Sequence, residues 1–228
     1  MKYVLVSEDL PKESFNILSK YGKVVKTREN DNLLEGLKSH PDMLLHPLPN
    51  GDIICDRDNI SYYKSIFGDR NVLGTYKSLA KNYPQDVMLN CVTYDKYFIH
   101  NIKYTDKLVL DYYKQNRYEL INVKQGYTKC SILVANDFLV TSDDGIYNNL
   151  KDIVPIYKIA PKQIKLKNFD YGFIGGASGS IGKELFITGD LLQHTSNKYL
   201  NEIAEEHGYN IRLLCDSLIE DLGSILFF

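Results

Sequence analysis

The sequence lacks tryptophan, any long hydrophobic run and an excess of charge of either sign. No window approaches the roughly 18 consecutive apolar residues of a membrane-spanning helix. The apolar run near the N-terminus, Tyr3–Val6, is also far shorter than the core of a signal peptide. Lys and Arg number 27 against 29 Asp and Glu, a formal net charge of −2. Because nucleic-acid affinity is built largely from clustered positive charge, we expect neither a nucleic acid nor a membrane as partner.

Cysteine is also sparse, and its spacing excludes the common structural uses of a thiol. The four cysteines, Cys55, Cys91, Cys130 and Cys215, lie 36, 39 and 85 residues apart, with no C-x-x-C pair and no cluster with histidine. Neither a zinc ribbon nor a disulfide framework fits this pattern, and we expect no bound metal or cofactor. Reduced thiols and a cytoplasmic location are therefore expected.

What the sequence does contain is a repeated pattern of an apolar strand, a short turn, a second apolar strand and a polar stop. Successive polar stops are separated by 45, 42 and 47 residues, and the turns carry residues typical of hairpins, such as Asn50-Gly51. The segments with this pattern are Asp42–Asp56, Asp86–Asn101, Lys129–Asp143 and Gly172–Asp190.

Each of these hairpins is followed by a helical pattern and then by a short apolar strand. The predicted helices are Ser61–Phe67, Thr105–Asn116, Asp144–Leu150 and Ser196–His207. The strands predicted after them are Asn71–Thr75, Tyr118–Val123, Ile153–Ile159 and Asn210–Leu214. The repeating unit is therefore β-β-α-β.

The two ends of the chain are typical of a fifth unit that is split in two. Lys2–Ser7 is a predicted strand, Pro11–Lys20 a helix and Lys23–Thr27 a second strand, while Gly223–Phe228 supplies the missing hairpin strand. Pairing of the last strand with the first would close a ring and hide the free sheet edges of an open array. Five units of about 46 residues fill the chain, so we predict a single α/β domain over residues 1–228. The alternative is a coincidental period in an ordinary α/β protein with hairpins.

A closed ring of five β-β-α-β units resembles the pentein fold, the five-fold pseudosymmetric α/β propeller of the enzymes that modify guanidino groups. The strongest local similarity is Gly126–Val134 (GYTKCSILV), which resembles the cysteine-bearing strand of the hydrolases of that superfamily. The chain is also similar to an uncharacterised bacterial family of this fold. The resemblance implies a small cationic ligand in the central channel. It also implies a cysteine thiolate that attacks the guanidinium carbon, a histidine that relays protons and carboxylates that hold the cation.

Cys130, His46 and Asp143 are the candidate catalytic residues. In a five-fold ring the first strand of each hairpin would line the channel, and there Cys130 is the candidate nucleophile, with Cys91 as the second choice. Strand alternation puts His46 on the opposite face from Leu45, within reach of the channel. Each candidate has a structural alternative: a small buried residue at a strand start for Cys130, a core histidine for His46 and a helix cap for Asp143.

Acidic and amide side chains around the predicted channel are the candidate ligands for a cation. Asparagine and two adjacent acids lie where channel-lining strands are expected, and the polar stops would form a second acidic tier. Aspartate at such stops is also typical of N-caps and Asx turns, and His40 is assigned to a loop. The candidate substrate-binding residues are Asp56, Asn90, Asp190, Glu220 and Asp221.

Two functions remain open on the sequence. The first is a cysteine-dependent hydrolase or transferase that acts on a small guanidino or amidino compound. The second is a non-catalytic pentein that binds a partner, as the translation initiation factor of this superfamily does. In the hydrolases an acidic Gly-Gly-Asp segment and a His precede a Cys near the C-terminus, whereas here Gly175-Gly176 follows Cys130. An enzyme needs a cysteine, a histidine and two acids within hydrogen-bond reach, and a binding module needs a blocked or inert channel.

Overall fold

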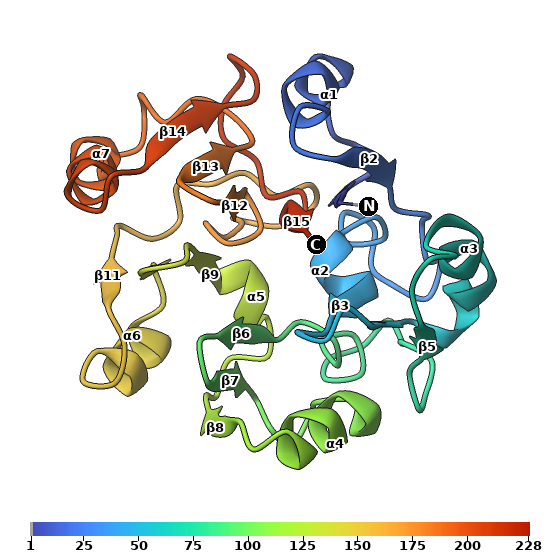
Figure 1. Cartoon of the computed structure of the whole chain (residues 1–228). Coiled ribbons are helices and arrows are strands. Elements are labelled where there is room, and N and C mark those ends of the chain that lie inside the picture. The colour runs from blue at the N-terminus through green and yellow to red at the C-terminus, as the bar shows by residue number, and fades with distance from the viewer. Residues whose placement is uncertain (1) are drawn as a thin grey trace.

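The computed structural model describes residues 2–228, and in them five three-stranded sheets stand around a common centre (Figure 1). The strands are β1 (Tyr3–Val6), β2 (Lys23–Lys26), β3 (Leu45–Pro47), β4 (Ile53–Cys55), β5 (Val72–Gly74), β6 (Val92–Tyr94), β7 (Tyr97–His100), β8 (Glu119–Asn122), β9 (Ile132–Val134), β10 (Leu139–Thr141), β11 (Ile156–Lys158), β12 (Ser178–Ile181), β13 (Glu184–Ile187), β14 (Asn210–Leu213) and β15 (Leu226–Phe227). The helices are α1 (Lys12–Leu18), α2 (Pro41–Leu44), α3 (Ile60–Ile66), α4 (Lys107–Gln115), α5 (Thr128–Ser131), α6 (Asp144–Leu150) and α7 (Asn197–Glu206), with a 3-10 turn at Arg57–Asn59. Of these helices, none is long and apolar enough to cross a membrane.

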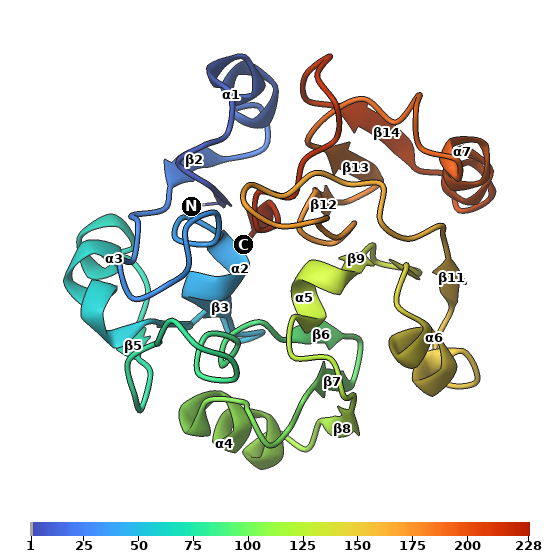
Figure 2. The ribbon, with the colours of Figure 1, turned by 180° about the vertical axis from the view of Figure 1, so that it is seen from behind.

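Every sheet has the same strand pairing. The middle strand pairs antiparallel with the first strand and parallel with the last, as β4 does with β3 and β5. A parallel pair needs a crossover connection, and the longer helices supply it on the outside of the ring (Figures 1 and 2). The predicted β-β-α-β unit is therefore confirmed in an α/β ring of five sheets.

The two ends of the chain complete the fifth sheet. β15 runs antiparallel to β1, with Val4 opposite Phe227 and Leu5 opposite Leu226, and the Tyr3 N–H donates to the Phe228 carbonyl at 2.7 Å. β1 also pairs in parallel with β2 on its other edge. The predicted closure of the ring by the C-terminal and N-terminal strands is confirmed.

Burial explains which residues form these elements. The middle strands β4 and β10 are buried along their whole length, because each lies between two other strands and is covered on both faces, and their sequences are correspondingly rich in apolar residues. The outer helix α7 instead buries one stripe, Leu200, Ile203 and Ala204, at the spacing of a helix face. The apolar side of α7 therefore packs toward the ring and its polar side faces solvent.

Two short helical turns, α2 and α5, replace parts of predicted strands. The sequence pattern extends strands back to Asp42 and Lys129, but these residues lie in α2 and α5, which directly precede β3 and β9. In α2 the first helical position is Pro41, whose fixed φ favours a helix start. In α5 the N–H groups of Lys129 and Cys130 both donate to the side-chain oxygen of Asn90, which belongs to another sheet unit. The prediction of a strand start at Cys130 is therefore wrong, because the helix start is capped through a tertiary contact.

Candidate functional site

The ring brings together the residues that precede the first strand of each sheet. These strands begin at Leu45, Val92, Ile132, Ser178 and Leu226. The residues two positions earlier are Met43, Asn90, Cys130, Gly176 and Ser224. The Asn90 amide nitrogen lies 3.3 Å from the Met43 sulfur and 3.0 Å from the Cys130 sulfur, and the Ser224 N–H donates to the Gly176 carbonyl at 2.7 Å. Positions related by the five-fold repeat thus meet at the centre.

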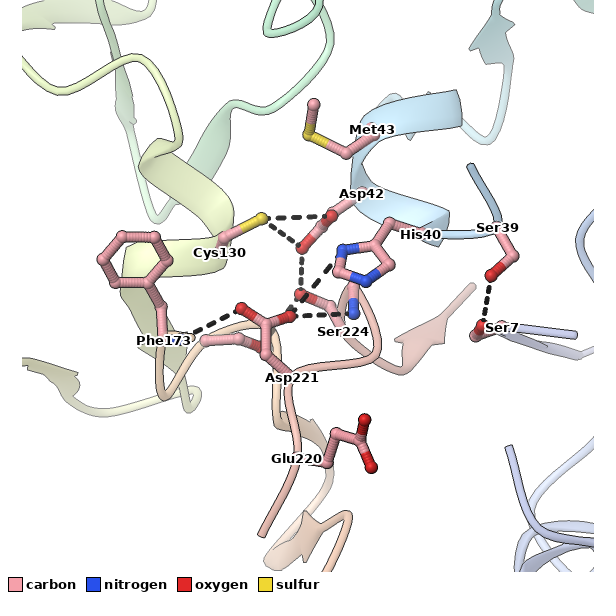
Figure 3. A network of polar contacts seen from close by, with 12 residues as sticks. Ser7, Ser39, His40, Asp42, Met43, Cys130, Phe173, Glu220, Asp221 and Ser224 are labelled. Atoms are coloured by element: carbon pink, nitrogen blue, oxygen red, sulfur yellow. Dashed lines mark hydrogen bonds and ion pairs between the residues drawn. The ribbon is translucent and has the colours of Figure 1, made fainter. Parts of the chain in front are cut away.

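The thiol of Cys130 is buried in this centre, at 2% exposure of the residue. Its Sγ lies 3.3 Å from each carboxylate oxygen of Asp42, which comes from α2 across the ring (Figure 3). Burial first, and then the negative charges of Asp42 and Asp221, raise the pKa of the Cys130 thiol well above its usual value. The thiol is therefore protonated at neutral pH and donates a hydrogen bond to Asp42.

Asn90 fixes the position of Cys130 through both ends of its amide. Its oxygen accepts from the N–H groups of Lys129 (2.8 Å) and Cys130 (3.1 Å), and its nitrogen donates to the Cys130 sulfur (3.0 Å) and to the Asp42 carbonyl (3.2 Å). Asn90, Cys130 and Asp42 are buried and Lys129 is half-buried, so these groups would lose their partner with little access to water if Asn90 were removed. Asn90 is thus a positioning residue for the thiol.

Asp42 is held on its other side by Ser224 and Lys129. The Ser224 hydroxyl donates to Asp42 Oδ2 at 2.6 Å, and the Lys129 ammonium donates to the Ser224 hydroxyl at 3.0 Å. Burial lowers the pKa of Lys129, while the neighbouring Asp42 partly opposes that shift. The Asp42 carboxylate is therefore fixed in orientation beside the thiol, with a buried amine one hydroxyl away.

His40 and Asp221 form the second buried acid–base pair of the cluster. His40 Nδ1 lies 3.7 Å from Asp221 Oδ1 and has no hydrogen-bond partner, while the Asp221 carboxyl accepts from the N–H groups of Phe173 and Gly223, each at 3.0 Å (Figure 3). Burial first, and then the charge of Asp42, raises the pKa of Asp221 to about 8. Burial lowers the pKa of His40. At neutral pH the pair is therefore a mostly protonated carboxyl beside a neutral imidazole.

Two glycines make this close packing possible. A Cβ on Gly176 would lie 1.9 Å from Asp221 Oδ1, and a Cβ on Gly223, whose φ is +79°, would lie 2.2 Å from the His40 Cβ. A side chain at either position would displace the acid or the imidazole. Gly176 of the Gly175-Gly176 pair is therefore part of the site because the missing side chain leaves space for the Asp221 carboxyl group.

Three cavities reach the cluster from different sides. One of about 250 Å³ is lined by Cys130 and Asp221, and one of about 230 Å³ is lined by His40, Asp221 and Glu220. A third of about 140 Å³ is lined by Asp42, Lys129 and His46 and has mainly apolar walls. Only the first of these three cavities has both the thiol and a carboxyl group in its wall, so it is the candidate substrate cavity.

Three of the sequence-predicted site residues come together in this cluster. Cys130, Asn90 and Asp221 lie on three different sheet units, and the contacts described above place them around one point. Cys91, the second choice as nucleophile, is also buried, but its sulfur donates to the Leu89 carbonyl at 3.2 Å. The geometry therefore favours Cys130 over Cys91.

His46 and Asp143, the other two predicted catalytic residues, make their hydrogen bonds elsewhere. His46 Nε2 lies 2.7 Å from the Tyr113 hydroxyl, and burial lowers the pKa of His46 to about 3. Asp143 caps α6 by accepting from the Ile146 N–H at 2.8 Å. Neither contact supports the predicted catalytic roles.

The remaining predicted ligands lie outside the cluster as well. Asp56 accepts from the N–H groups of Leu79 (2.9 Å) and Asp58 (3.3 Å), and Asp190 accepts from the Leu192 N–H (2.8 Å). These contacts are those of turn and cap residues, the structural alternative for aspartate at polar stops. Glu220 lines the cavity beside His40 and Asp221.

Four cluster residues, His40, Asp42, Lys129 and Ser224, had no predicted role. His40 and Asp42 flank Pro41, a signal for a helix start that the strand pattern of the following residues overrode. Ser224 lies two residues before the first strand of its sheet, as Cys130 does, and can be recognised as its counterpart once the strand starts are known. The signal was therefore present, but it depends on strand boundaries that a sequence pattern does not fix.

His40, Asp42 and Cys130 also form a set of donors that could hold a metal ion. One ligand atom from each lies within 4.8 Å of the other two, and all three residues are buried. A nitrogen, an oxygen and a sulfur donor together suit zinc. The same three groups are a thiol, an imidazole and a carboxylate, the residue types on which nucleophilic acyl or amidino transfer depends.

The fold is similar to that of several solved structures of guanidino-modifying enzymes. The structure superimposes on a dimethylarginine dimethylaminohydrolase (DDAH) from Pseudomonas aeruginosa complexed with citrulline with a TM-score of 0.61, at 6% identity, covering 99% of this chain and 98% of that one. It superimposes on the amidinotransferase SxtG from Microseira wollei with a TM-score of 0.54, at 10% identity, over 96% and 93% of the two chains. For an agmatine deiminase from C. jejuni the TM-score is also 0.54, at 8% identity, over 93% and 87%.

At these identities the likeness establishes the fold, which is the pentein fold predicted from the repeat. The chain belongs to the family described as "Family of unknown function (DUF6873)", which it matches over residues 5–226. No curated protein matches the sequence significantly.

Proposed function

We propose that this chain is a cysteine-dependent hydrolase or transferase that acts on a small guanidino or amidino compound, with Cys130 as the nucleophile. The observation that carries the proposal is the position of the Cys130 sulfur, 3.3 Å from both oxygens of Asp42 and in the wall of a cavity of about 250 Å³ that also contains Asp221. A planar cation with several N–H donors is the ligand that two carboxyl groups beside a thiol can bind. The guanidino-modifying enzymes that share the fold support this choice of substrate class.

The electrostatics of the cluster favour activation of the thiol by the substrate itself. Without a ligand, burial and the two carboxyl groups raise the pKa of the Cys130 thiol. A guanidinium ion bound beside the thiol would offset the negative charge of Asp42 and favour the thiolate instead. The nucleophile would thus form only when a cation is bound, which protects it from other reagents.

The residues present can complete the transfer with balanced protons. Asp42 takes the thiol proton, the sulfur bonds to the guanidinium carbon, and the bond from that carbon to the departing amine breaks. The amine takes its proton from Asp221, whose pKa of about 8 keeps it protonated at neutral pH, with His40 3.7 Å away to exchange protons. Water then attacks the amidino carbon and returns one proton to Asp221, while the departing sulfur recovers its proton from Asp42 and the second water proton passes from the product oxygen to the released amine. An amine acceptor in place of water would make the same reaction an amidino transfer.

Selective labelling of Cys130 by a cationic electrophile tests the proposal. Chloroacetamidine is a cation and chloroacetamide is its neutral counterpart, and each alkylates a thiolate with loss of chloride. We expect chloroacetamidine to modify Cys130 in preference to the partly exposed Cys215, and chloroacetamide to modify Cys215 in preference to the buried Cys130. Peptide mapping by mass spectrometry over time gives both rates.

The Asp42→Asn variant provides the matched comparison for this labelling. It retains the shape of the side chain but removes the charge beside the sulfur, so the preference of Cys130 for the cationic reagent should fall at least about tenfold while Cys215 reacts as before. If Cys130 of the wild-type protein reacts no faster with the cation than with the neutral reagent, the hydrolase proposal is rejected. The non-catalytic binding module would then be the better description.

A further inference from the structure

The walls of the substrate cavity are aromatic. The cavity of about 250 Å³ has Cys130 and Asp221 in its lining, and its remaining walls are mainly large apolar side chains. These are Leu37, Tyr127, Leu166, Phe169, Tyr171 and Phe173. Four of the six are aromatic, and the last four come from one segment, residues 166–173, that precedes β12. A volume just below the usual range of about 300–1,000 Å³ for ligand pockets indicates a small ligand.

This cavity offers a cation or an apolar group favourable contacts, but offers a carboxylate none. The acidic residues that line it are Asp170 and Asp221, and no Lys, Arg or His is present among the described residues of its lining. The neighbouring Lys167 lines the cavity on the His40 side and pairs with Glu35 at 3.4 Å. Lys162 lies 5.5 Å from the centre of the Tyr171 ring and is not part of the lining. A substrate carboxylate here would lose its hydration next to two acids and receive no ion pair in return.

From this lining we infer that the substrate carries its guanidino or amidino group on an uncharged apolar or aromatic group and not on an amino-acid tail. The inference rests on the proposed function, because it places the cationic head beside Cys130 and Asp221. The tail then lies among the rings of Tyr127, Phe169 and Phe173. The faces of these rings also attract the cationic head. Phe169 lines the cavity and is 38% exposed, so its ring would lie between the tail and solvent.

A pair of tailed electrophiles tests the inference. Chloroacetamidine substituted on nitrogen with a 2-phenylethyl group is compared with the same reagent carrying a 4-carboxybutyl group. We expect the phenylethyl reagent to alkylate Cys130 at least about tenfold faster, since one or two apolar groups in a fitted pocket discriminate by that amount or more. The Phe169→Ala variant should lose most of this preference. Tyr76→Ala, which removes an exposed ring outside the cavity, should retain it.

The possible failures are distinguishable. If unsubstituted chloroacetamidine labels Cys130 selectively but the carboxybutyl reagent reacts as fast as the phenylethyl one, the inference is overturned and the proposed function stands. If no amidine labels Cys130 selectively, the proposed function fails. The dissociation constants of 2-phenylethylguanidine and of L-arginine for the Cys130→Ala protein, measured by calorimetry, then test the tail preference of the cavity without any reaction at the thiol. We expect the phenylethyl compound to bind more tightly. Binding of arginine as tightly as the phenylethyl compound would contradict the inference there too.

Discussion

At the scale of single residues, the site depends on polar groups that are buried without full compensation. His40 Nδ1 has no hydrogen-bond partner, and Asp221 shares a buried space with Asp42. Burying such groups costs stability, and the cost is usually tolerated where function needs it. The cluster should therefore respond to substitution in ways that a purely structural core would not.

We expect Asp221→Asn to change how stability depends on pH. In the folded protein Asp221 keeps its proton up to about pH 8, whereas in the unfolded chain it ionises near its ordinary value of about 4. Between these pH values the unfolded state binds fewer protons at this site, so the carboxyl makes the folded state less stable as the pH rises. The free energy of unfolding of the variant, relative to wild type, should therefore increase steadily from pH 4 to pH 8 in urea titrations. A difference that is flat across this range would contradict the assigned protonation.

Asn90→Ala should destabilise the protein because the N–H groups of Lys129 and Cys130 lose their shared acceptor. A buried donor without a partner costs about 1–3 kcal/mol, so we expect the free energy of unfolding to fall by about 1–3 kcal/mol or more. Chemical denaturation measures it. The matched control is Asn201→Ala on the exposed face of α7, which should stay within about 0.5 kcal/mol of wild type. Equal effects of the two substitutions would show that the cap across the ring has no special role.

At the scale of elements, helix starts decide where the functional side chains point. α2 and α5 each turn the chain once before a strand, and this turn carries Asp42 and Cys130 to the centre. α6, which lies on the outside of the ring (Figure 1), begins instead at Asp144 and is capped by the carboxylate of Asp143. Aspartate therefore lies beside the thiol where it precedes the first strand of a sheet, and caps a helix where it follows the middle strand.

Asp143→Ala should lower stability and leave Cys130 reactivity unchanged. Loss of an N-cap costs about 1 kcal/mol, and Asp143→Asn, which can still cap, should recover most of it. Thermal denaturation measures the first effect, and the rate of Cys130 alkylation by chloroacetamidine measures the second. A large drop in that rate for Asp143→Ala, with normal stability, would instead support the catalytic role predicted from the sequence.

At the scale of the whole molecule, the ring depends on the pairing of β15 with β1. This strand brings Leu226 into the core, and places Phe227 against Phe186 and Phe228 against Phe67, with ring centres 5.3 and 5.4 Å apart. The segment with Asp221 and Ser224 leads directly into β15, so the pairing of β15 also holds these two residues in place. Closure and site formation are thus coupled, because one strand serves both.

Removal of residues 226–228 should destabilise the whole ring. Full burial of a large apolar side chain contributes about 1.5–3 kcal/mol, and because Phe227 and Phe228 are only half-buried, we expect a loss of roughly 3–6 kcal/mol in the free energy of unfolding for the three residues. The exposed edge of β1 should also promote association, which light scattering detects. Leu192→Ala, at a largely exposed side chain, is the control and should change neither quantity. Wild-type stability in the truncated protein would mean that closure is not required.

The sequence by itself determined the repeat, and through it the fold. Apolar alternation, hairpin turns and a spacing of 42 to 47 residues depend on local chemistry, so the five units and the split unit at the ends could be recognised before any coordinates. For the same reason Cys130, Asn90 and Asp221 could be selected as side chains near the centre. Helix α6 was predicted with its observed bounds, because its cap is a neighbour in sequence.

Only the tertiary structure decided which histidine and which second acid accompany Cys130. His40 and Asp42 are about 90 residues from the thiol in sequence, and their approach depends on the helical turn of α2 and, for His40, on Gly223, which leaves space for the imidazole. His46, close by in the chain, follows the same turn, but the next strand directs it toward Tyr113. The local sequence pattern determines which helices and strands form. Closure of the ring determines which side chains meet at the centre, because the contacts between these side chains join different sheet units.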